Sequence, residues 1–113
     1  MKDWHKTLPK RIRVGHCYYT VGLLDRRQAV ADDRWGSHSR ERLEIDLDPE
    51  LPAPVAAETL LHEIFHAVYD MWALEDTDNE ERMCDAVAGS LCMIWADNPL
   101  LVRWLNEILG GKR

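Results

Sequence analysis

Two histidines and a glutamate lie close together near the middle of the chain. His62, Glu63 and His66 form an H-E-x-x-H motif. On a helix, residues four apart lie one turn apart on the same face, so both imidazoles can direct a nitrogen at one zinc ion. Glu63 is about 100° around the helix from His62 and can serve as the base that takes a proton from an attacking water. The motif therefore predicts a zinc site with hydrolytic chemistry.

A catalytic zinc site usually has three protein ligands, so a third must come from elsewhere in the chain. The extended motif that adds a histidine further along the same helix is absent. A second helix expected over 80–96 offers Glu80 and Glu81, which could also serve only to stabilise the helix N-terminus. We favour Glu81 as the ligand because Asp85 lies one turn further on the same face. Asp85 can accept the N–H of a ligand histidine and fix its tautomer.

The same second helix has a face of small residues that would let the two helices approach closely enough to share a metal. These residues are Ala88, Gly89 and Cys92. The chain has three cysteines and no C-x-x-C pair, so a disulfide framework is not expected. Cys84 and Cys92 fall in an apolar helical pattern and are predicted to be small core residues.

The motif needs a helix to carry it and a core to hold that helix. Pro52 and Pro54 precede a long helical pattern, with Pro54 suited to the first turn. A wide apolar stripe runs along this helix and leaves both histidines off the core face. The stripe comprises Ala57, Leu60, Leu61, Ile64, Phe65, Val68, Met71 and Trp72.

The remaining elements are read from periodicity and from turn residues. One or two strands are predicted over 11–24 with a turn or bulge at Gly15, and a half-exposed strand over 42–47. Residues 25–40 read as a loop with a helical turn at 27–31. Asn98 and Pro99 begin a final helix through Leu109. The prediction is one α+β domain, 1–113, with a three-stranded sheet packed on the H-E-x-x-H helix.

Composition excludes several classes of function. The 113 residues are 46% hydrophobic and 30% charged, as in an ordinary globular domain. With a net charge of −6 and no continuous basic run, the chain is not expected to bind nucleic acid. No apolar stretch suits a signal peptide or a membrane span, so we expect a cytoplasmic protein without a membrane partner. Composition leaves the oligomeric state undetermined.

The two helices together resemble a known family. His62-Glu63-x-x-His66 followed by Glu81-x-x-Cys84-Asp85-x-Val87-Ala88 is similar to the pattern of the ImmA/IrrE family of small zincin-type metallo-endopeptidases. Over residues 40–97 the resemblance implies a minimal zincin-like fold. It also implies zinc ligation by His62, His66 and Glu81, with Glu63 as catalytic base and Asp85 behind the ligands. The chain departs from the family in having Cys84 and Val87, where alanine and phenylalanine are frequent, and a short linker between the two helices. These departures leave the implied metal site intact and bear on the substrate.

The expected activity is zinc-dependent hydrolysis of peptide bonds in a protein substrate. The resemblance implies a regulatory substrate such as a phage or mobile-element repressor. An extended substrate could pair with the strand Leu43–Leu47 if that strand is a free edge. Two alternatives remain: a zinc-binding interaction module without catalysis, and a metal-free helical interaction protein. Candidates for a second electrophile, which the sequence does not rank, are Tyr18, Tyr19, Tyr69, His16 and His38.

Overall fold

The computed structural model describes residues 2–32, 34–75 and 80–110. Within these ranges it describes every side chain except those of Asp32, Glu80, Glu81, Cys84, Asp85 and Ala88. The elements in chain order are α1 (Trp4–Thr7), β1 (Arg11–Val14), β2 (Cys17–Leu23), α2 (Arg26–Asp32), β3 (Gly36–Ser39), β4 (Glu44–Leu47), α3 (Ala53–Met71), α4 (Glu80–Asp97), α5 (Pro99–Leu105) and a π-helical turn η1 (Asn106–Gly110).

The sheet is mixed and has four strands, in the order β1-β2-β4-β3. β1 and β2 are antiparallel, β2 and β4 are parallel, and β4 and β3 are antiparallel. The prediction of three strands was therefore wrong. The missed strand, β3, has the sequence Gly-Ser-His-Ser and is half-buried throughout. It carries neither the β-branched residues nor the alternation that identify a strand in sequence.

The place of β4 in the sheet corrects a second expectation. β4 lies between β2 and β3, so the stretch Leu43–Leu47 is not a free edge. Leu43 itself has φ 54° and belongs to the turn that joins β3 to β4, which shortens the predicted strand. At this side of the sheet, β3 is the edge strand among the described residues, and any strand addition would occur there.

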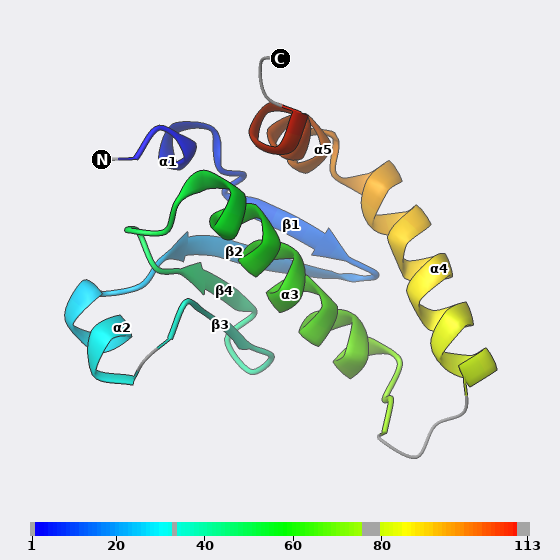
Figure 1. The fold of residues 1–113 in the computed structure, drawn as a ribbon. Helices are drawn as coiled ribbons and strands as arrows, with labels where there is room; N and C mark the ends of the chain where they lie inside the picture. The colour runs from blue at the N-terminus through cyan, green and yellow to red at the C-terminus, as the bar shows by residue number, and fades with distance from the viewer. Residues whose placement is uncertain (1, 33, 76–79, 111–113) are drawn as a thin grey trace.

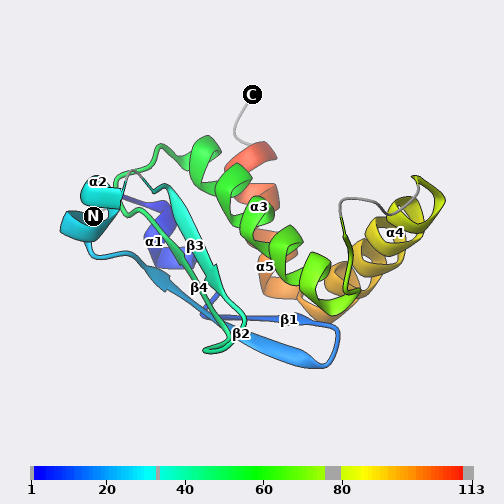
Figure 2. The ribbon, with the colours of Figure 1, turned by 90° about the horizontal axis from the view of Figure 1, so that it is seen from below.

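Helix α3 crosses one face of the sheet, and α1 and α5 lie on the same side (Figures 1 and 2). The opposite face is more open: in β2, Tyr19 and Val21 are buried while Tyr18 and Thr20 are exposed. One covered face and one solvated face explain this alternation. The core forms where sheet, α3 and α5 meet; among its fully buried members are Ile45, Leu47, Leu60, Ile64, Leu101 and Trp104.

The described burial on α3 agrees with most of the predicted stripe. Pro54 lies in its first turn, and Ala57, Leu60, Ile64 and Val68 are buried. Phe65, at the margin of the stripe, is 36% exposed. Thr59, which lies outside the predicted stripe, is also buried, because β3 packs against it.

Helix α4 starts away from the sheet and runs back towards it, so that its C-terminal end lies beside β1 (Figures 1 and 2). Its best buried described residues are Ala86, Ser90 and Ile94. Cys92 is exposed, so its predicted place in the core was wrong, and the side chain of Cys84 lies outside the described residues. Only part of the surface of α4 packs against the rest of the protein. The prediction from its apolar periodicity therefore gave too many buried residues.

Asn98 precedes α5 as predicted, but its side chain forms no cap. Its Oδ1 accepts the Arg13 N–H at 2.7 Å, and its Nδ2 donates to the carbonyl oxygens of Arg13 and Ile94. Asn98 thereby pairs the outward backbone groups of edge strand β1. Gly15, with φ 63°, turns β1 into β2, as predicted. No helix in the described part of the chain is long and apolar enough to cross a bilayer.

Candidate metal centre

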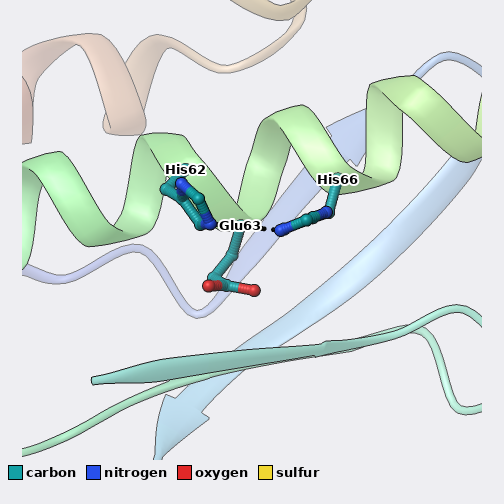
Figure 3. Close-up of side chains that lie close together, drawn as sticks. All are labelled: His62, Glu63 and His66. Carbon is teal, nitrogen blue, oxygen red and sulfur yellow. Dashed lines mark hydrogen bonds between the residues drawn. The ribbon is translucent and has the colours of Figure 1, made fainter. Parts of the chain in front are cut away.

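The structure brings His62, Glu63 and His66 together in the middle of α3 (Figure 3). The two Nε2 atoms lie 3.1 Å apart. One nitrogen from each histidine and one carboxylate oxygen of Glu63 all lie within 4.8 Å of one another. Among the described residues this is the one group of three or more such side chains that could hold a metal ion.

The spacing of the two imidazoles fits a shared ion. Two nitrogens bound to one tetrahedral ion at about 2.0–2.1 Å lie about 3.3 Å apart, close to the observed 3.1 Å. Both histidines are exposed on the side of α3 away from the α5 core, so neither ring needs to leave the interior to bind. Their rings meet edge to face, with centroids 4.7 Å apart and an interplanar angle of 79°. This donor set can bind a metal ion.

Glu63 differs from the histidines in being buried, with 7% of its surface exposed. The edge strand β3 covers it. A Cβ added at Gly36 would lie 3.2 Å from the Glu63 Cγ and 2.8 Å from the Thr59 Cγ2. The absence of a side chain at position 36 therefore lets β3 approach α3 closely and hold the stem of Glu63 beside the histidines.

A cleft of about 420 Å³ opens next to this group. Its lining comprises Arg34, Trp35, Gly36, Glu58, Thr59, His62 and Glu63. It thus joins the start of β3 to the histidine face of α3. Trp35, 60% exposed, offers an apolar surface beside the metal-binding group. Such a cleft can admit a chain segment next to Glu63.

Of the five candidate electrophiles, His38 and Tyr19 lie near the motif. The His38 ring, on β3, stacks on His66 with centroids 5.9 Å apart, and the Tyr19 ring lies 5.9 Å from His38. Burial, and then electrostatic interactions with Cys17 and Asp70, raise the pKa of Tyr19. By contrast, Tyr18 is exposed and lies beneath Arg11 on the outer face of the sheet.

The proposed third ligand and its neighbour are not tested by the structure. The side chains of Glu80, Glu81 and Asp85 lie outside the described residues. Arg82 donates a hydrogen bond to the Trp72 carbonyl, which places the first turn of α4 at the C-terminal end of α3.

The sequence predicted that the small residues of α4 let it approach α3 closely. The described residues of α4 give no sign of such a close approach. Gly89 is exposed, and a Cβ added there would meet only Trp72, at an ordinary 3.9 Å. The two helices are tied instead by the Trp72 indole, which donates to the Ser90 hydroxyl at 2.7 Å.

Comparison with known proteins adds no assignment. No family model, no curated protein and no solved structure matches this chain.

Proposed function

We propose that this protein is a zinc-dependent peptidase that hydrolyses peptide bonds in a protein substrate. The observation that carries the proposal is the convergence of the His62 and His66 Nε2 atoms, 3.1 Å apart, beside the carboxylate of Glu63. Imidazole nitrogens are common zinc ligands, and a neighbouring carboxylate that does not bind the metal can act as the base in hydrolysis. When bound, zinc supplies Lewis acidity that activates water and polarises a carbonyl group.

Each residue has a distinct part in this proposal. His62 and His66 hold the ion, and Glu81 completes the set of ligands, with Asp85 supporting them, as the resemblance to ImmA/IrrE peptidases implies. Glu63 takes a proton from water and delivers it to the leaving amine. Because β3 and Gly36 fix the stem of Glu63, its carboxylate can move protons without a large change of rotamer.

The substrate is proposed to bind along β3 rather than along Leu43–Leu47. β3 is the edge strand and leads into the 420 Å³ cleft at Gly36. An extended peptide that pairs with this edge would pass Glu63 and present a side chain to Trp35. The resemblance suggests a regulatory protein, such as a repressor of a phage or mobile element, as the physiological substrate.

The test compares the protein with its Glu63→Gln variant. Zinc binding is measured by equilibrium dialysis and metal analysis, and hydrolysis by mass spectrometry of a mixture of unstructured peptides of varied sequence. Glu63→Gln should bind zinc as the parent does but lose at least about 100-fold in hydrolysis, because it removes the general base. Glu107→Gln, which alters an exposed acid on η1, is the matched control and should retain full activity.

The outcomes separate the alternatives. Zinc binding by the parent protein without any hydrolysis would favour an interaction module that retains the ligands. Absence of zinc binding would refute the metal site itself, and hydrolysis that survives Glu63→Gln would refute the role of Glu63.

A further inference from the structure

His38, on the edge strand β3, lies against one of the two histidines on α3. Its ring stacks on that of His66, with centroids 5.9 Å apart and an interplanar angle of 14°. Its side chain is only 14% exposed. His38 is not one of the three residues whose donor atoms converge, so its contact with the site passes through His66.

A second residue of α3 holds the other side of this imidazole. The His38 Nε2 lies 2.9 Å from the Asp70 Oδ2. Asp70 follows His66 by one helical turn, so both contacts of His38 lie along one line on α3. The Nε2 atom is buried and makes no hydrogen bond of good geometry to any described group.

The sheet supports the same ring from below. Tyr19, on β2, is 3% exposed, and its ring lies 5.9 Å from that of His38. His38 pairs in the sheet with Ile45, which is fully buried. The backbone of His38 is thus held in the sheet, and its ring lies against Tyr19, Asp70 and His66.

We propose that His38 is a positioning residue that fixes the ring plane of His66 for metal binding, and that Asp70 holds His38 in place. The proposal rests on the metal site described above. His66 is exposed and would otherwise lose rotational freedom when it binds an ion. A flat ring fixed against it restricts that freedom beforehand, as groups behind the ligands do in other metal sites.

The test separates the flat ring from the volume it fills. His38→Phe keeps a flat ring against His66, while His38→Leu fills similar space without one. Zinc affinity is measured by competition with a chromophoric chelator, and ligand geometry by the visible absorption of the cobalt(II)-substituted protein. We expect His38→Leu to weaken zinc binding about 10- to 100-fold and to change the cobalt spectrum. His38→Phe should remain within about threefold of the parent, by the same reasoning.

Two further variants complete the test. Asp70→Asn should weaken zinc binding less than His38→Leu, because the stacked ring remains. Ser37→Ala, on the neighbouring residue of β3, is the control and should leave affinity and spectrum unchanged. Far-ultraviolet circular dichroism of each variant establishes that the fold is retained.

The inference is overturned if His38→Leu binds zinc as the parent does, or if His38→Phe loses as much affinity as His38→Leu. These results would leave the metal site standing, since the parent would still bind zinc. Failure of the parent to bind zinc would instead refute the metal site, and the role of His38 with it.

Discussion

The contact between β3 and α3 at Gly36 gives a prediction that can be worked out from distances. In Gly36→Ala, the new Cβ would lie 2.8 Å from the Thr59 Cγ2 and 3.2 Å from both the Asp46 carbonyl oxygen and the Glu63 Cγ. The first distance is too short to persist, so either the Thr59 methyl or the edge strand must shift. Because Thr59 is buried, it has little room to move.

The expected cost is the difference between two terms. Overpacking of this kind costs about 1–3 kcal/mol. Alanine also lowers the conformational entropy of the unfolded chain relative to glycine, which stabilises the folded protein by about 0.4–1 kcal/mol. Gly36→Ala should therefore lower the free energy of unfolding by about 0.5–2 kcal/mol. Displacement of Glu63 by a few tenths of an ångström should also reduce hydrolysis about tenfold, with little change in zinc affinity.

A double-mutant cycle with Thr59→Ser isolates the contact. Serine keeps the hydroxyl and removes Cγ2, the atom nearest the added Cβ, at a cost of about 1 kcal/mol for the lost methyl. Urea unfolding of the four proteins should show that Gly36→Ala costs at least about 0.5 kcal/mol less when residue 59 is serine. Additive effects would mean that Thr59 does not limit the approach of β3, and the reasoning would fail.

Gly89→Ala is the matched control for the glycine substitution itself. Gly89 lies in the middle of α4, and among the described residues its added Cβ would meet only the Trp72 ring, at 3.9 Å. Alanine should therefore raise the free energy of unfolding by up to about 1 kcal/mol through helix propensity. Loss of stability would indicate a closer contact between α3 and α4 than this structure has.

Three further predictions follow from other contacts. Burial, and then the Glu44 carboxylate, raise the pKa of Asp46 above its ordinary 3.8; its contribution to stability is present below that value and is lost as pH rises through the folded-state pKa. Asp46→Asn should therefore gain in urea midpoint relative to the parent as pH rises above 3.8, and a constant difference would contradict this. Asn98→Ala should cost about 2–4 kcal/mol in the free energy of unfolding, because it leaves backbone groups of Arg13 unpaired; a cost below about 1 kcal/mol would show that water replaces the amide. Glu81→Ala should weaken zinc binding in a chelator competition by more than about 100-fold, beyond the loss from a supporting residue, whereas Glu80→Ala should change it little; equal losses would refute the choice of Glu81.

Sequence predicted those parts of the fold whose signals are local. The apolar stripe of α3, the turn at Gly15 and the strand containing Ile45 each arise from periodicity or turn residues within a short segment, and each is present. β3 could not be predicted in this way, because its residues are strand only through pairing with β4. The exposure of Cys92 likewise depends on which side of α4 packs against the rest of the protein, which its own sequence does not specify.

The candidate site also combines residues that local sequence signals reveal with residues that only tertiary contacts reveal. His62, Glu63 and His66 share one helix, so the helical repeat alone brings them together, and the motif sufficed to find them. The groups that fix them come from a strand that sequence did not reveal: Gly36 allows β3 to cover Glu63, and His38 lies against His66 two residues further along. Alternate residues of a strand face the same side, so a single edge strand can support both the base and a ligand. The position of β3 is therefore as important to the proposed chemistry as the motif, and substitutions on β3 test that chemistry without altering any ligand.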